Sequence, residues 1–361
     1  MSQLKVNTIR HTAASSDAVT LASDGTCTAK ITNNLSNRRL TLNGDMSVAQ
    51  RGDATGLQSG YGGADRYLIS GNTDARVTLN KTTGPALQGF PSCQEVDVTT
   101  ADSSLAAGDY TYLGYRFEGQ DLQQLKKGTA NAESVTLSFW VSSPKTGTHI
   151  IQLYDNDNAR HISKSYTVNT ADTWEKKTLT FAGDTTGAFG NDNGYSLQIY
   201  WWLAAGSNYT DGTLATSWQA WNDGDAAVGQ VNCLDNTANN FKLTGVQLEV
   251  GDVATDFEHR SYGDELARCQ RYYELCANGR YGNIAGGGNL KIYTPFKTIK
   301  RASPTVTLID SQENCVSSVT VGNFPGGINS QVYGANIIGT NVGITGDNKY
   351  VDGLFSADSE L

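Results

Sequence analysis

Every second residue of the segment 135–141 is large and apolar, and this pattern constrains the fold more than any other feature. Successive side chains of a β-strand point to opposite faces, so Leu137 and Phe139 are expected together on one buried face. Further strands are expected at 149–154, 174–181, 195–203 and 241–250. Their spacing of roughly 10 to 25 residues, without amphipathic helices between them, predicts an antiparallel sandwich instead of βαβ units.

The composition agrees with short strands joined by tight turns. The 361 residues include 39 Gly and 17 Tyr, which are typical of turns and strands respectively. At about 150 residues per domain, this length predicts two or three domains. The net charge of −9, from 27 basic and 36 acidic residues, is unfavourable for binding nucleic acid.

Three absences bound the class of protein further. No run approaches 18 apolar residues, so membrane insertion is not expected. The first residues, MSQLKVNTIRHTAASSD, lack the apolar stretch of a secretory signal, so we expect synthesis in a cytoplasm. The cysteines are scattered, which predicts reduced, mostly buried thiols instead of a disulfide framework. They are residues 27, 93, 233, 269, 276 and 315.

The pattern divides the chain into four parts, at 1–39, 40–258, 259–279 and 280–361. The first part is a polar arm whose strand-like pieces, 4–9 and 18–21, cannot bury enough apolar area to fold alone. We therefore expect a docking segment, with Leu4, Val6 and Ile9 as its contacts. The alternative is an edge strand of the arm's own domain.

The third part carries the best helix pattern, over residues 261–276. Ser261 followed by Asp264 resembles a capping box, and Asn278 with Gly279 provides a stop. Helical spacing places one apolar face on Leu266, Cys269, Tyr273 and Cys276. This short helix is expected to connect the sandwich to a small C-terminal β domain with strands at 289–296, 304–309 and 317–321.

Signatures of catalysis are missing from the sequence, so no catalytic residue is assigned and no enzyme activity is expected. There is no G-x-S-x-G, H-E-x-x-H, Walker or G-x-G-x-x-G motif, and the four His are dispersed. Residues 155–158, Asp-Asn-Asp-Asn, offer oxygen ligands for calcium but lack the remaining EF-hand positions. A hairpin turn is favoured there, and no metal site or cofactor is expected.

Aromatic residues give the most informative candidate site. If Trp201 faces the core, then Tyr200 and Trp202 face outward from the same strand. Trp218 and Trp221 follow in a polar, loop-like segment. Exposed aromatic rings stack on the apolar faces of sugars, so these four residues are candidates for carbohydrate binding. The alternative is that Trp218 and Trp221 plug a sandwich edge or form a subunit contact.

Several segments resemble tail fibre proteins of tailed bacteriophages, of the marine and cyanobacterial phage type. Residues 43–52, NGDMSVAQRG, resemble the opening of their jelly-roll modules, and TGVQLEVG at 244–251 with ATDFEHRSY at 254–262 resembles the close. CQRYY at 269–273 resembles the short element that follows, and MSQLKVNTI resembles their virion-attachment arms.

The resemblance implies an all-β structural protein of the virion tail, made in the cytoplasm of the host bacterium. It implies a virion-docking arm at 1–39, a jelly-roll sandwich similar to carbohydrate-binding modules at 40–258, a connector helix at 259–279 and a distal β domain at 280–361. The implied partners are two further copies in a homotrimer, other tail proteins held through the arm, and host surface glycan. Two alternatives stay open: a purely structural capsid, collar or adaptor protein, and a depolymerase of envelope polysaccharide.

Overall fold

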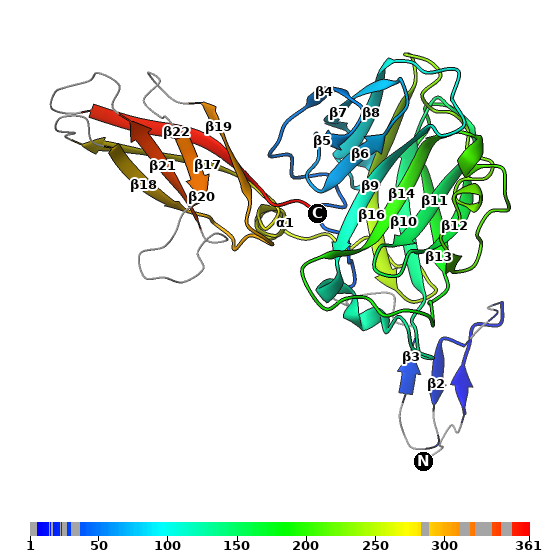
Figure 1. The fold of residues 1–361 in the computed structure, drawn as a ribbon. Helices are drawn as coiled ribbons and strands as arrows, with labels where there is room; N and C mark the ends of the chain where they lie inside the picture. The colour runs from blue at the N-terminus through cyan, green and yellow to red at the C-terminus, as the bar shows by residue number, and fades with distance from the viewer. Residues whose placement is uncertain are drawn as a thin grey trace.

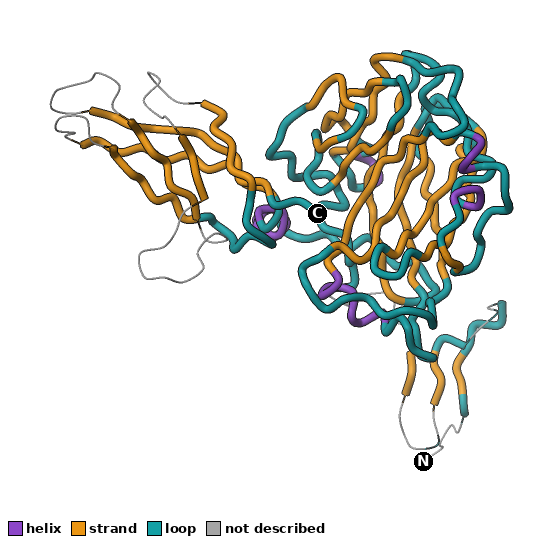
Figure 2. The backbone as a smooth tube through the Cα atoms, viewed as in Figure 1, coloured by secondary structure: helices purple, strands orange, loops and turns teal. Residues whose placement is uncertain are grey.

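A computed structural model describes residues 6–13, 15, 17–21, 23, 27–29, 37–282, 289–310, 318–321, 334–340 and 349–361. Strands dominate these residues, and the one α-helix among them is short (Figures 1 and 2). The all-β class expected from the sequence is therefore confirmed. No helix in the described ranges is long and apolar enough to cross a membrane.

The centre of the molecule is a sandwich of a six-stranded and a seven-stranded antiparallel sheet (Figure 1). In spatial order the six-stranded sheet contains β13 (Glu175–Phe181), β10 (Val135–Ser142), β16 (Asn240–Val250), β8 (Ser92–Thr100), β7 (Arg76–Thr83) and β4 (Ala54–Leu57). The seven-stranded sheet contains β15 (Gln219–Ala220), β12 (Arg160–Val168), β11 (Gly147–Asp155), β14 (Tyr195–Ala205), β9 (Tyr110–Glu118), β6 (Tyr67–Gly71) and β5 (Gly60–Tyr61).

The chain passes repeatedly from one sheet to the other, as in a jelly roll. From β8 it crosses to β9, returns to β10, and crosses again to the hairpin of β11 and β12 before β13. Four short 3₁₀ turns lie on the connections: η1 (Ala86–Gln88), η2 (Gly119–Leu125), η3 (Ser207–Tyr209) and η4 (Asp223–Asp225).

The core lies between the two sheets, and the alternation of β10 explains why. Leu137 and Phe139 are fully buried in it, as the pattern predicted. Trp201 of β14 faces the same core from the opposite sheet. At roughly 25 cal/mol per Å² of buried apolar surface, contacts of this kind supply most of the stability of a sandwich.

The arm forms its own small sheet of β1 (Thr8–Ile9), β2 (Val19–Leu21) and β3 (Cys27–Ala29). The described strands of the arm pair with one another, and both the docking segment and the edge-strand alternative stay predictions. Val6 and Ile9 are 37% and 54% exposed. Leu4 lies outside the described residues, and docking through the arm stays a prediction.

The helix α1 (Tyr262–Gln270) begins where the sequence predicts, with the Ser261 side chain accepting from the amide of Asp264. The predicted extension to residue 276 is wrong, because β17 (Tyr273–Gly282) follows almost directly. Tyr273 and Cys276 are therefore strand residues. The apolar residues of β17 fit a strand as well as a helix. Their spacing of three and four residues therefore did not distinguish a helix from a strand.

Two three-stranded sheets follow α1. One contains β17, β22 (Lys349–Asp358) and β19 (Thr305–Asp310), and the other contains β18 (Asn289–Pro295), β21 (Gly334–Thr340) and β20 (Ser318–Val321). Strand β22 runs back toward the sandwich, so the last residues lie beside α1 (Figure 1). There Arg51 of the sandwich bonds Asp358 at 2.7 Å and Glu360 at 3.3 Å.

The thiols that the structure describes are buried and free, at Cys93, Cys233, Cys269 and Cys276. This confirms the reduced state predicted for these four. Cys315 lies outside the described residues, and for Cys27 only the backbone is described.

Candidate functional site

Tyrosine rings form a row across the outer face of the seven-stranded sheet, which is the face turned away from the core. Tyr112 on β9 and Tyr200 on β14 stack with ring centroids 4.0 Å apart and 7° between their planes. Tyr154 on β11 lies 5.9 Å from Tyr200, and Tyr110 lies 6.0 Å from Tyr112. We call these four residues the tyrosine row; it spans three neighbouring strands.

A glycine gives the row its close spacing. Gly114 lies opposite Tyr200 in the register of β9 and β14. A Cβ atom at residue 114 would lie 2.6 Å from the Gln198 amide nitrogen and 3.2 Å from a ring carbon of Tyr112. Contacts this short force the neighbours to move, so the absence of a side chain lets the Tyr112 ring lie along the strand.

The segment 206–230 covers one end of this face. Ala226 and Ala227 are buried against it, and the Ser163 hydroxyl donates to the Ala226 carbonyl at 2.8 Å. Trp202 is consequently 1% exposed and Tyr200 8% exposed. Both residues point away from the core as predicted, but the expectation that they are exposed is wrong, because the loop removes their large apolar surface from water.

A polar network fixes Trp202 beneath the loop. Its indole Nε1 donates to the Gln152 side-chain oxygen at 3.1 Å, and the Gln152 amide nitrogen lies 2.8 Å from Nδ1 of His161. Burial lowers the pKa of His161 to about 4, against the opposing effect of Asp225. The imidazole is therefore neutral at neutral pH and accepts the Gln152 hydrogen bond.

Trp221 and Trp218 occupy different places. Trp221 is half-buried with its ring edge-on to Tyr154, at 5.1 Å, and 5.0 Å from the His161 ring. Trp218 instead packs on the margin of the main core, where its Nε1 donates to the Ala182 carbonyl at 2.7 Å. The structure thus brings Tyr200, Trp202 and Trp221 together, while Trp218 fills a sandwich edge.

The more accessible rings of this face, Tyr110 and Tyr154, were not predicted from the sequence. Tyr110 and Tyr154 are half-buried, whereas Tyr200 in the middle of the row is covered. The available signal was the alternation of Tyr110, Tyr112 and Gly114, which places all three on one face of a strand. Their neighbours follow only from the pairing of distant strands, which local patterns do not specify.

A Cys–His pair lies inside the sandwich but is unsuited to nucleophilic chemistry. The sulfur of Cys233 is 3.8 Å from Nδ1 of His149, and both residues are buried. Burial raises the pKa of the Cys233 thiol to about 12 and lowers the pKa of His149 to about 4. A catalytic thiolate requires the opposite shift of the thiol and access for substrate, so the pair is part of the core.

The acidic segment 155–158 is the turn between β11 and β12. The Asp155 carboxylate accepts from the amides of Asp157 and Asn158 at 3.0 and 3.2 Å. Its other oxygen is 2.6 Å from the Lys127 ammonium. The carboxylate that a calcium ion would use is therefore already ion-paired. Within the described ranges no three His, Cys, Asp or Glu residues gather as metal ligands.

Comparisons with known proteins give only distant structural similarity. No protein-family model and no curated protein sequence matches the chain. Among solved structures, CBM4 is 13% identical, with a TM-score of 0.31 over 58% of this chain and 97% of its own. A family 11 carbohydrate-binding module from Clostridium thermocellum is 12% identical, with a TM-score of 0.29 over 58% and 98%. The enzymatically active domain of tailspike protein 4 from bacteriophage CBA120 is 11% identical, with a TM-score of 0.27 over 59% and 21%.

Proposed function

We propose that the tyrosine row binds glycan and that its half-buried ends, Tyr110 and Tyr154, make the first contacts. The observation that carries the proposal is the row itself, four rings at 4.0 to 6.0 Å spacing across three strands. Flat apolar rings stack on the C–H faces of pyranose units, and neighbouring polar groups bond the hydroxyls. Arg116, which is half-buried and donates to the buried Gln198 oxygen at 3.2 Å, supplies one such group beside the row.

The test is titration of the full chain with envelope polysaccharide fragments and neutral oligosaccharides, followed by calorimetry. Tyr154→Ala and Tyr110→Ala are expected to weaken binding on the order of tenfold, since each removes one stacking surface. Tyr262→Ala is the matched control, because Tyr262 is 59% exposed on α1. Binding that is unchanged in both row variants would contradict the proposal.

We further propose that the chain is a non-catalytic, homotrimeric tail fibre of a bacteriophage, attached to the virion tail through its arm. This rests on the resemblance of its motifs and on the exposed apolar residues Val6 and Ile9 of the arm. Ile9→Asp is expected to prevent incorporation into particles while the isolated protein keeps its unfolding midpoint. Light scattering of the purified chain tests the trimer, and a monomer at all concentrations contradicts it.

A purely structural role in the virion is the second candidate. The covering of Trp202 and Tyr200 by the segment 206–230 favours it, because the buried part of the aromatic layer serves packing. This role predicts no glycan binding and no effect of Tyr154→Ala on adsorption to host cells. The same calorimetric titration therefore separates the two candidates.

A further inference from the structure

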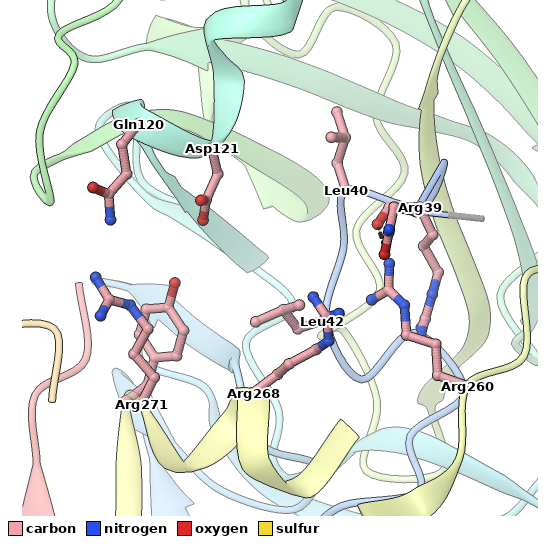
Figure 3. A pocket seen from close by; sticks show the side chains of 10 residues that line it. Arg39, Leu40, Leu42, Gln120, Asp121, Arg260, Arg268 and Arg271 are labelled. Carbon is pink, nitrogen blue, oxygen red and sulfur yellow. Dashed lines mark hydrogen bonds between the residues drawn. The ribbon is translucent and has the colours of Figure 1, made fainter. Parts of the chain in front are cut away.

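A cavity of about 410 Å³ opens beside α1. Three segments line it: residues 37–42 after the arm, η2, and the connector that carries α1 (Figure 3). Four arginines contribute to the lining, and one acidic residue, Asp121, does so. The arginines are Arg39, Arg260, Arg268 and Arg271. Cavities of roughly 300 to 1,000 Å³ are the usual size of small-molecule sites.

Two of the arginines are already neutralised by close carboxylates. Arg271 forms a bidentate pair with Glu118, at 2.8 and 2.7 Å. Arg39, whose side chain is fully buried, is bonded to Glu265. These pairs form part of the packing around the cavity and leave little positive charge for a ligand.

Arg260 has no carboxylate of the described chain within hydrogen-bond distance. Its side chain is 7% exposed, and its Nε and Nη1 have no hydrogen-bond partner among the described residues. The nearest carboxylate oxygens, of Glu258 and Glu265, are both 3.9 Å away, beyond hydrogen-bond distance. Only its Nη2 is bonded, to the Arg39 carbonyl at 2.5 Å. A buried N–H group without a partner destabilises the fold, and more so when it belongs to a charged group.

Arg268 faces Arg260 across the cavity. Figure 3 shows the two guanidinium groups pointing toward one another. Arg268 is 39% exposed, and its hydrogen bond to Asp264, within α1, is long at 3.3 Å. Besides burial, the charges of Arg39 and Arg268 lower the pKa of Arg260. Two like charges held together in this way are stabilised by an anion between them.

We propose that this cavity binds a small oxyanion, a carboxylate, sulfate or phosphate group, between Arg260 and Arg268. The oxygens of such a group accept from the unpartnered Nε and Nη1 of Arg260 and from the Arg268 guanidinium. The volume exceeds that of an inorganic ion and accommodates an acidic monosaccharide. This site is separate from the tyrosine row and does not depend on glycan binding there.

The experiment is calorimetric titration of the full chain with sodium phosphate, sodium sulfate and sodium glucuronate, at constant ionic strength set with sodium chloride. Glucose is the neutral control of similar size to glucuronate. Arg268→Gln is expected to weaken oxyanion binding on the order of tenfold, because it removes one charged donor. Asp264→Asn is expected to strengthen binding severalfold, because it releases Arg268 from its carboxylate. Arg268→Lys keeps the charge and should retain part of the affinity.

The outcomes are distinct. Equal affinity for phosphate and glucuronate supports the site and assigns it to a free inorganic anion, and a preference for glucuronate supports it and assigns it to an acidic sugar. The proposal is overturned if none of the three anions binds above the chloride background. It is also overturned if Arg268→Gln, folded by circular dichroism, binds as the parent chain does.

Discussion

The guanidinium of Arg66 lies over the ring of Tyr272, with its central carbon 3.4 Å from the ring centroid. Arg66 belongs to the sandwich and Tyr272 follows α1, so this contact joins the two parts of the molecule. Arg66 is 1% exposed, is ion-paired with Glu360, and donates to the Arg116 carbonyl at 2.8 Å. The junction therefore combines the buried ion pair of Arg66 and Glu360 with the contact between the Arg66 guanidinium and the Tyr272 ring.

Arg66→Ala is expected to lower the free energy of unfolding by about 3 to 5 kcal/mol. The substitution leaves Glu360, whose side chain is 4% exposed, with a poorly compensated buried charge. Urea unfolding monitored by fluorescence measures the change. Glu133→Ala breaks the exposed Lys126–Glu133 pair and serves as the control, with an expected change below about 1 kcal/mol. Similar losses in the two variants would refute the prediction.

Trp202→Phe is expected to destabilise the chain more than Trp201→Phe, by about 1 kcal/mol. The two residues are adjacent and fully buried, but the Trp202 indole N–H is bonded to Gln152 and the Trp201 N–H has no partner in the described chain. Replacing Trp202 leaves a buried acceptor unsatisfied, whereas replacing Trp201 removes an unsatisfied donor. The denaturation midpoints of the two variants measure the difference in stability. A larger loss in Trp201→Phe than in Trp202→Phe would contradict the role of the hydrogen bond between Trp202 and Gln152.

Stability is expected to fall as the pH decreases from about 6.5 to 4. Burial lowers the pKa of both His149 and His161 to about 4, from 6.5 in the unfolded chain. Between these values the unfolded chain binds more protons, so the stabilisation is present above pH 6.5 and is lost as the pH falls. Each histidine contributes a slope of roughly 1.4 kcal/mol per pH unit in that window.

The variant His161→Gln isolates one of the two contributions to this pH dependence. Its stability at pH 7 is lower than that of the parent chain if the imidazole bond to Gln152 is lost. Its dependence on pH between 4 and 6.5 should be shallower, because one titrating group is gone. Parallel pH profiles for the variant and the parent would show that His161 does not titrate as inferred.

The four described thiols are expected to resist a soluble disulfide reagent at pH 8 in the folded chain. Burial raises the pKa of Cys93, Cys233 and Cys276 to about 12, and that of Cys269 also lies well above its usual range. A variant with residues 27 and 315 changed to Ser isolates these four. It should react fully after denaturation, and fast reaction in native buffer would contradict the buried assignment.

The sandwich was predictable because alternation is a local property of the sequence. Leu137, Phe139 and Trp201 occupy the core face that the pattern assigned to them. The end of α1 was not predictable in the same way, because Tyr273 and Cys276 fit a helical face and a strand equally well. Their pairing with Asp358 and Phe355 of β22 decides the matter, and those partners are about 80 residues away in the chain.

The candidate site was predictable only in part. Side chains along β14 alternate between the two faces of the sheet, and this period of two correctly placed Tyr200 and Trp202 on the outer face. Their burial depends on the segment 206–230, whose path carries no periodic signal. The stacking of Tyr112 on Tyr200 depends on the register of β9 against β14, and that register follows from the whole sheet.

Strand β22 gives the molecule a mechanical property. It is the central strand of its sheet, paired on both sides, and its chain continues directly into Glu360, which is held by Arg51 and Arg66 of the sandwich. The C-terminal sheets are thus joined to the sandwich at two places, through α1 and through the end of β22. A force on their far end is transmitted through both connections. Moving these sheets independently of the sandwich therefore requires the buried Glu360 to separate from Arg51 and Arg66.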